Sequence, residues 1–495
     1  MALNNHILTI IEPSIKLDEF NFKSFNEEGG DNKVSPGYGT DRVPFVVING
    51  YVFHSKSIKN LEIRCDNTIP TIELSVIDLD SKFSVDTFPR DGDVINVRIG
   101  SRQIDQYKDL RIDFDIDKVD TNLQSSTQIG TGGCKYNFFG KMKIPGMFAE
   151  QCKSYEKSTS LDHLEKIADD LKIGLATNID ASDDAMQLLV AYQPMLEVIE
   201  NLVKHSYVDE NSFQTYAIDA YYYLIYVNMN KLLYSEEDLK EDVILGLIDN
   251  FNDEVGQDNA TNEIKTNNIL TNHPRAKNLG NYVGRYALDN KSGNKVKKNG
   301  YKKTLQFFED DSPEKLVSFD VEPLTSDNLK DIEEPLRGRK DEDRYKKEVK
   351  FKYVGRKDTD PDTANTHLNY IFSEIHNKQN LEEIDKLSLN IELPTFNASL
   401  HRFQKVPVII FQLTNQQTGA DHVLKKKKEE SGFKTKPKKD FQGSEIADNS
   451  TVDEFLTGFY VINSIIYKYN KRDGKVRQEL NLIRREWPSR INNLG

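Results

Sequence analysis

Three carboxylates at alternate positions, Asp113, Asp115 and Asp117, have the spacing that most resembles a chemical site. Carboxylates spaced in this way begin calcium-binding loops. Lys118, however, stands where such a loop needs its turn glycine. The intervening positions are apolar, which is typical of a half-buried strand (Ile112, Phe114 and Ile116). We therefore expect a strand whose outer face is acidic, either solvated or lining a lumen, and no metal site.

The histidines and cysteines are scattered and form no ligand set. His367 and His376 share a predicted helix, but their separation does not bring them together as ligands. Other histidines have no His or Cys partner at metal-binding spacing (His54, His163, His205 and His401). The three cysteines are far apart and include no CxxC pair, which argues against a zinc site or a disulfide framework (Cys65, Cys134 and Cys152).

Catalytic motifs are not visible either. The glycine-rich segment 130–133 lacks the Lys-Ser/Thr of a phosphate-binding loop, and no G-x-S-x-G occurs. With 79 acidic residues, no single carboxylate pair points to acid–base catalysis. The lysine run 425–428 could contact nucleic acid or an acidic partner, or belong to a solvated mobile loop. The sequence thus predicts no catalytic, cofactor-binding or metal-binding residues, and a protein that is not an enzyme.

The composition is that of a large folded chain with much solvated surface. A length of 495 residues predicts two to four domains. Charged residues reach 29%, whereas 25 Phe and 22 Tyr argue against wholesale disorder. The net charge of −13 argues against a dedicated nucleic-acid-binding protein, because phosphate contacts need Lys and Arg.

Residues 1–11 carry an apolar patch without a basic region or a small-residue cleavage site, so we expect no signal peptide. No apolar run is long enough for a membrane span. We therefore expect folding in the cytoplasm without stable membrane association.

The fold expected is α+β and β-dominated, with two similar small antiparallel β-barrels and inserted α+β modules. After an N-terminal arm (1–42), the first barrel spans 43–150, with strands at 94–99, 110–119 and 136–144. An α+β insert follows over 151–235. Ser160 is its predicted N-cap, Pro194 a first-turn proline, and 215–229 two strands.

The second half is read from the same patterns. An irregular middle module covers 236–345, with strands around 279–288 and 301–308. The second barrel covers 346–495. It opens with a helix over 363–377 and a strand over 387–393, followed by strands at 406–413, 459–469 and 475–484. A mobile Lys-rich loop interrupts it at about 421–454.

The two barrels show the same order of events: a turn, a strand, a loop, an alternating strand, a connection and a strand. Two similar units in one chain have a geometric use, because three chains around an axis would then present six similar positions. A ring of this kind can join a hexameric tube to a trimeric object.

The order of these elements resembles the central baseplate hub proteins of contractile-tailed bacteriophages, and the related hub segments of type VI secretion spike proteins. The stretches that carry the resemblance are DGDVINVRIG (91–100), STSLDHLEKIADDLKIG (158–174), QPMLEVIENLVKHSY (193–207), RFQKVPVIIF (402–411) and GFYVINSIIYKY (458–469). The arm, the middle module and the Lys-rich loop depart from that pattern.

The resemblance implies a homotrimeric ring in the virion tail baseplate, assembled in the host cytoplasm. Its partners would be the tail tube, the central spike and the baseplate wedge proteins. DNA would pass through its channel during genome ejection, repelled by acidic faces. Since no β-helical repeat follows the second barrel, we expect the spike to be a separate chain. The alternatives are a tail-associated cell-wall hydrolase and a receptor-binding tail protein.

Overall fold

The structure is a computed structural model, and it describes residues 2–4, 7–17, 43–53, 57–78, 83, 92–100, 110–123, 134–234, 245–246, 283–291, 303–309, 312–321, 347–354, 366–367, 369–385, 387–394, 396–398, 400–409, 456 and 458–484. The glycine-rich segment 130–133, the Lys-rich loop at 421–454 and most of the arm over 1–42 lie outside these residues. So does His54.

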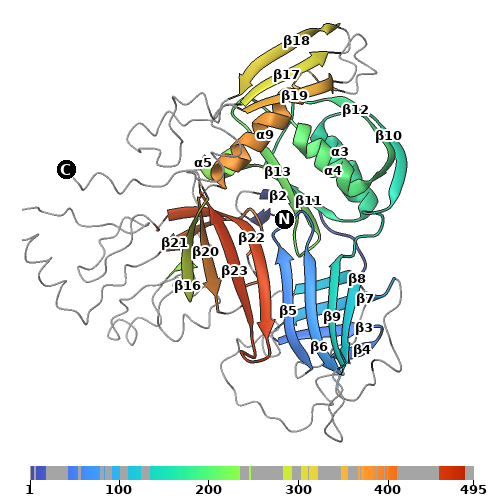
Figure 1. The fold of residues 1–495 in the computed structure, drawn as a ribbon, viewed down its shortest axis with the longest axis vertical. Helices are drawn as coiled ribbons and strands as arrows, with labels where there is room; N and C mark the ends of the chain where they lie inside the picture. Colours follow the sequence, from blue (N-terminus) through green and yellow to red (C-terminus); the bar gives the residue numbers. More distant parts are fainter. Residues whose placement is uncertain are drawn as a thin grey trace, which may run out of the picture.

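The chain is β-dominated, as expected, with several antiparallel sheets and few helices (Figure 1). Its first β unit, defined here as the strands between residues 43 and 142, consists of β3 (Val43–Ile48), β4 (Tyr51–Phe53), β5 (Ile58–Cys65), β6 (Thr71–Asp78), β7 (Val94–Gly100), β8 (Leu110–Leu123) and β9 (Cys134–Met142). The expected strands at 94–99, 110–119 and 136–144 are β7, β8 and β9.

The second β unit comes from the other end of the chain. It consists of β15 (Leu245–Gly246), β16 (Arg285–Asn290), β20 (Leu387–Leu393), β21 (Lys405–Ile409), β22 (Gly458–Asn470) and β23 (Val476–Ile483). The strands expected at 387–393, 459–469 and 475–484 are thereby confirmed, and in the first of them apolar and polar residues alternate strictly. β16 and β21 lie where strands were expected, with different ends.

Both units belong to one 13-stranded sheet, in which β5 of the first unit pairs with β22 of the second. Pairing among the described strands does not close either unit into a barrel. The two barrels therefore stay a prediction, while the β-dominated α+β class is confirmed.

The insert forms a separate layer next to this sheet. It contains β10 (Glu150–Ser158), α3 (Ser160–Leu171), β11 (Gly174–Thr177), β12 (Met186–Pro194), α4 (Met195–His205), β13 (Gln214–Ile218), β14 (Tyr223–Asn228) and α5 (Met229–Tyr234). β11, β13 and β14 share a five-stranded sheet with β1 (Ala2–Asn4) and β2 (Ile7–Ile11). The two-stranded sheet of β10 and β12 curls around α3 and α4 (Figure 1).

The helix caps differ in detail from the sequence prediction. The N-cap of α3 is Thr159 and not Ser160, because the Thr159 hydroxyl accepts from the Asp162 amide in a capping box. Ser160 is the first helical residue instead, and its amide donates to Asp184 at 3.0 Å. Pro194 is the N-cap of α4, one residue before the first turn in which it was expected.

The middle of the chain adds a three-stranded sheet of β17 (Lys303–Glu309), β18 (Ser312–Val321) and β19 (Lys347–Val354), drawn at the top of Figure 1. Helix α9 (Tyr370–Ile384) follows, and it begins and ends later than the expected 363–377. Among the described residues, no helix is both long and apolar enough to span a membrane.

Candidate functional site

The two β units have the same strand topology, which extends the repeat beyond the three strands expected. Neighbours across the first unit follow the order β5-β6-β9-β8-β7, and across the second the order β16-β20-β23-β22-β21. In both units, successive strands of the chain occupy the first, second, fifth, fourth and third positions of this order. Every neighbouring pair is antiparallel. Two matching five-strand orders are strong support for an internal duplication.

The repeat extends to an irregularity in the long central strand of each unit. The ladder of β8 with β9 shifts register between Ile116 and Lys118, and that of β22 with β23 shifts between Ile462 and Ser464. Just before the shift, the amide of Ile116 donates to the carbonyl of Asp93, and the amide of Ile462 donates to the carbonyl of Gln404. β-bulges of this kind bend a strand and re-aim it.

The bend allows one edge of β22 to serve two strands. Residues 458–461 pair with β21, whereas residues 465–470 pair with β5, with Ile465 opposite Cys65 and Asn470 opposite Asn60. We call the contact of residues 60–65 with 465–470 the seam. It joins the two ends of the chain by backbone hydrogen bonds.

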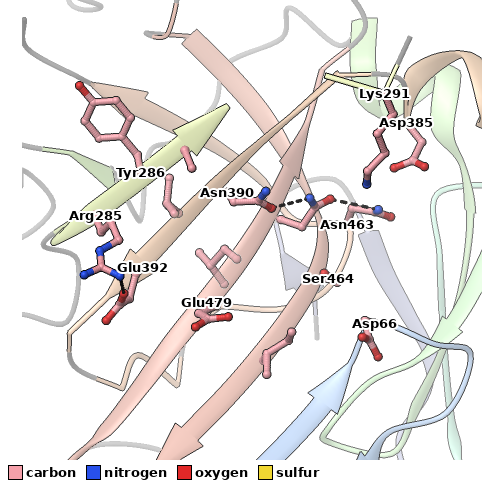
Figure 2. A pocket seen from close by; sticks show the side chains of 15 residues that line it. Asp66, Arg285, Tyr286, Lys291, Asp385, Asn390, Glu392, Asn463, Ser464 and Glu479 are labelled. Atoms are coloured by element: carbon pink, nitrogen blue, oxygen red, sulfur yellow. Dashed lines mark hydrogen bonds and ion pairs between the residues drawn. The ribbon is translucent and has the colours of Figure 1, made fainter. Parts of the chain in front are cut away.

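Beside the seam, the outer face of the second unit forms a pocket of about 420 Å³ (Figure 2). Its floor carries a ladder of amides: Asn481 donates to Asn390 at 2.7 Å, and Asn463 donates to Asn481 at 3.3 Å. Two carboxylates of the lining are held in cross-strand ion pairs, Glu392 with Arg477 at 2.8 Å and Glu479 with Lys468 at 2.6 Å. These pairings favour a structural role over acid–base chemistry.

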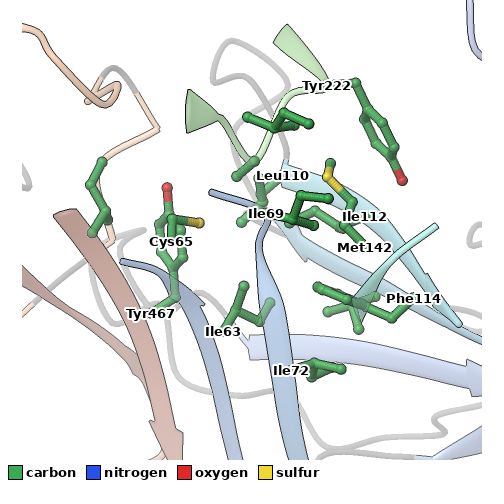
Figure 3. Packing of buried hydrophobic residues seen from close by; sticks show 14 of the residues in the cluster. Ile63, Cys65, Ile69, Ile72, Leu110, Ile112, Phe114, Met142, Tyr222 and Tyr467 are labelled. Atoms are coloured by element: carbon green, nitrogen blue, oxygen red, sulfur yellow. The ribbon is translucent and has the colours of Figure 1, made fainter. Parts of the chain in front are cut away.

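On its inner face the seam merges the cores of the two units (Figure 3). Tyr467 of β22 and Cys65 of β5 are buried together there with Ile63 and Ile72. Desolvation raises the pKa of Cys65 to about 12 and raises that of Tyr467 well above its usual value, so both stay neutral near pH 7.

Arg402, which precedes β21, donates hydrogen bonds to both sides of the seam. Its Nε donates to the carbonyl of Asn463 at 2.7 Å, and its two Nη atoms donate to the carbonyls of Asn67 and Asp66 in the turn between β5 and β6. Burial lowers the pKa of Arg402 to about 10, which still leaves the guanidinium charged near pH 7. The planar fork suits this task, since it can satisfy several carbonyls at once.

A buried carboxylate, Asp219, ties the insert to the same place. Its Oδ1 accepts from the amides of Tyr221 and Tyr223 at 2.8 and 2.9 Å, and its Oδ2 lies 3.2 Å from His401 Nδ1. The hydroxyl of Tyr221 donates to the carbonyl of Ala398 at 3.0 Å. The turn between β13 and β14 is therefore bonded to the segment that leads into β21.

Helix α9 joins the C-terminal part of the chain to the end of α4. Asn377 Nδ2 donates to the carbonyl of Ser206 at 3.1 Å, and Ser373 Oγ donates to that of His205 at 2.8 Å. The ring of His205 stacks on Tyr370 with centroids 3.7 Å apart. Side chains of α9 thus satisfy carbonyls that the last turn of α4 leaves without helical partners.

The three alternate carboxylates of β8, Asp113, Asp115 and Asp117, differ in solvent exposure more than predicted. The prediction is wrong for Asp113, which is 7% exposed and accepts from Asn96 at 2.8 Å. Its amide donates to the hydroxyl of Tyr222, a residue of the insert that covers this part of β8. Desolvation raises the pKa of Asp115, whereas Asp117 lies at the surface 3.7 Å from Lys141.

Of the other candidate residues, the structure brings His367 next to His205. No group of three His, Cys, Asp or Glu side chains suited to a metal occurs in the described part of the chain. His163 contacts the carbonyl of Met186 at 2.9 Å, and His367 contacts that of His205 at 2.8 Å. The cysteines are free thiols, with Cys65 and Cys134 buried and Cys152 exposed.

Sequence reasoning missed Arg402, Asp219 and the strand pair β5–β6. The strand pair had a readable signal, because apolar residues alternate on both sides of the polar turn 66–68. Arg402 and Asp219 carry no periodic signal, since each is a single polar residue whose burial depends on distant parts of the chain.

No family model and no curated protein matches this chain. Solved structures do. A 43 kDa tail protein of the prophage MuSo2 from Shewanella oneidensis is similar at a TM-score of 0.46 and 10% identity, over 90% of this chain and 98% of that one. A tail protein from Neisseria meningitidis MC58 gives 0.44 and 10%, over 90% and 96%.

An Escherichia coli component of the type VI secretion system, described as similar to the T4 tail proteins gp27 and gp5, gives a TM-score of 0.37 and 10% identity over 89% of this chain and 76% of that one. The similar structures are thus two tail proteins, one of them from a prophage, and a component of the type VI secretion system. The likeness is one of general arrangement and not of sequence.

Proposed function

We propose that this chain is the structural hub of a contractile-tail baseplate, a homotrimeric ring that joins the tail tube to the central spike. In this role the chain is not an enzyme. Its partners are the tube protein, a separate spike and the surrounding wedge proteins, and DNA crosses its channel during ejection.

The observation that carries the proposal is the pair of equivalent five-strand units in one sheet. Three chains with two equivalent units each present six similar positions on one side of a ring while keeping threefold symmetry. A tube with sixfold symmetry needs the first property, and a trimeric spike needs the second.

The bonding around the seam supports this role. A ring keeps six equivalent positions only if the two units of each chain hold a fixed relation to one another. Here a backbone ladder, a shared core and the buried Arg402 all connect them. The insert is fixed to the same place through Asp219, so the whole chain can act as one rigid segment of a ring.

The charge of the chain fits a channel for DNA in transit. With a net charge of −13, the average interaction with a polyanion is repulsive, and DNA would pass without binding. Two carboxylates of the pocket beside the seam, Glu392 and Glu479, are neutralised in ion pairs, so the repulsion comes from the rest of the surface.

The test is the oligomeric state of the purified chain. We expect a mass of three chains, about 170 kDa from the 56.8 kDa monomer, by light scattering at micromolar concentration, and a threefold ring in negative-stain images. A monomer at every concentration, with and without the cognate spike, would contradict the ring. Hydrolysis of purified peptidoglycan by the same preparation would contradict the non-enzymatic role.

A further inference from the structure

We infer that the ring closes by strand pairing between chains: the outer edge of β8, over residues 117–123, accepts β16 of the next copy. Within one chain the same pairing already exists, since β22 accepts β5 at the seam. The inference rests on the proposed trimer and adds to it the two surfaces that meet and their register.

The equivalence between the two edges follows from the duplicated topology. β8 and β22 hold the same position in their units, and so do β5 and β16. In both long strands the preceding strand covers only the first part of one edge, up to the bulge: β7 reaches Asp115 of β8, and β21 reaches Val461 of β22. Beyond the bulge, β22 is completed by β5.

The equivalent positions in the first unit have no such completion within the described strands. Past Asp115, the edge of β8 that faces β7 pairs with no described strand, and β16 pairs on one side only, with β20. In Figure 1 these two edges lie on opposite sides of the molecule, β8 at the right and β16 at the left. Two different edges on opposite sides give a head-to-tail contact, which generates a ring when the rotation closes.

A row of paired residues fixes the register. In each unit, four residues on four neighbouring strands are paired in a row. In the first unit the row is Ile63, Ile72, Gly140 and Ile116. In the second unit it is Leu288, Leu389, Leu482 and Ile462. Ile63 therefore corresponds to Leu288. Across the seam Ile63 faces Tyr467, which is five residues after Ile462. The residue five after Ile116 is Thr121, so Leu288 of one chain faces Thr121 of the next.

The equivalent residues Ile63 and Leu288 differ in solvent exposure, as expected if Leu288 is covered only in the assembled ring. Ile63, which the seam covers, is 0% exposed, whereas Leu288 is 43% exposed and is one of the few large apolar side chains left at the described surface. Val119, which corresponds to the buried Ile465, is likewise only partly buried. Covering both side chains removes apolar surface from water, as the seam does for Ile63 and Ile465.

A second copy of this chain is the occupant that the structure favours. A foreign strand could add to either edge alone, but only another copy supplies both edges with the topology that the chain already uses at its own seam. An exposed edge strand is otherwise a site of uncontrolled association. Ring closure pairs the edge of β8 with that of β16, so neither of these two edges stays exposed.

The first experiment compares Leu288→Asp with Leu189→Asp. Both substitutions place a charge on an exposed apolar strand residue, but Leu189 lies on β12, outside the two edges. We expect Leu288→Asp to raise the dissociation constant of the trimer at least tenfold in sedimentation equilibrium, with an unchanged circular dichroism spectrum. Leu189→Asp should assemble as wild type does. A Leu288→Asp protein that trimerises like wild type would overturn the inference.

The second experiment tests the register by disulfide trapping. In a Cys152→Ser background, which removes the exposed thiol, Leu288→Cys and Thr121→Cys are combined in one chain. Directly opposed strand residues have the Cα separation that a disulfide needs. We expect a covalent trimer on a non-reducing gel. Ala287→Cys with Thr121→Cys is the control, because a shift of one residue points the thiols to opposite faces.

The outcomes separate the two proposals. A trimer without cross-links in the matched pair overturns the strand pairing and leaves the hub intact. A wild-type chain that stays monomeric overturns the ring and the strand pairing together. A covalent trimer with the matched pair alone supports both.

Discussion

The Arg402 guanidinium donates to the carbonyl of Asn463 in β22 and to that of Asn67 in the turn after β5, 335 residues earlier in the chain. One side chain thus bonds to both sides of the seam. Because it is buried, its cost of desolvation is offset only while these carbonyls remain in place.

Replacing Arg402 by Met should therefore destabilise the chain. The substitution keeps much of the apolar stem but leaves buried carbonyls without donors, and we expect a loss of about 2–4 kcal/mol in the free energy of unfolding. Urea unfolding followed by circular dichroism measures it. Arg472→Met, at an exposed turn, is the control and should change stability by less than about 0.5 kcal/mol. Equal effects of the two substitutions would contradict this role.

The aromatic core of the seam can be tested at Tyr467, which is buried against Phe396 with ring centroids 5.6 Å apart. Tyr467→Ala leaves a cavity where the two units meet, and we expect a loss of about 3–5 kcal/mol. Tyr192→Ala removes the same side chain at a site 78% exposed and should cost far less. The comparison requires only thermal melts of the two variants beside wild type. A stability loss at Tyr467 no larger than at Tyr192 would count against a shared core.

Acid should weaken the contact between α4 and α9. Burial lowers the pKa of His205 and of His376 to about 4, against about 6.5 in an unfolded chain. The unfolded chain therefore binds more protons between these values, so stability falls as pH decreases from about 6.5 towards 4. The loss is at most about 3 kcal/mol for each histidine.

Urea midpoints measured between pH 7 and 4 would show this slope. His376→Gln removes one of the titrations that cause this slope, so the slope should be shallower than in wild type, whatever its effect on stability at pH 7. A slope unchanged by the substitution would mean that other groups cause the acid sensitivity. Glu374, whose carboxylate lies 4.0 Å from His205, favours the charged imidazole and limits the effect at that residue.

Gly140 allows β8 and β9 to approach closely at the bulge. A Cβ at this position would overlap the carbonyl oxygen of Asp115, which is backbone and cannot move aside cheaply. We expect Gly140→Ala to cost about 2–4 kcal/mol and to disturb the register beyond the bulge. Gly284→Ala is the matched control, because its Cβ would meet only ordinary contacts of 3.4 Å and longer. If the strands could separate without cost, Gly140→Ala and Gly284→Ala would have the same melting temperature.

The strands of both units were readable from the sequence because each buries one face. β8 alternates apolar and polar residues over most of its length, whereas β22 is rich in apolar and aromatic residues. Their positions differ from the prediction by a few residues. The pairing of β5 with β22 was not readable. It joins segments 400 residues apart, and a strand pattern identifies the buried face but not the neighbour at each edge.

Helix α9 shows where the hydrophobic pattern stops being informative. Its first turns carry apolar residues, but its later part is polar, and Asn377, Gln379 and Asn380 are buried. Those amides are inside the protein because they bond to neighbouring backbone and side chains, as Asn377 does to the end of α4. Polarity read as solvent exposure therefore ended the predicted helix too early. The same reasoning placed Asp113 at the surface.

The direction of the seam has a mechanical consequence. β5 and residues 465–470 of β22 run antiparallel along a common edge, so a force directed along the strands loads all of their hydrogen bonds at once. A force across the strands would instead open the bonds one after another from an end. The two halves of the chain should therefore resist sliding past each other far more strongly than they resist being peeled apart, and the direction of pulling would decide how the molecule yields.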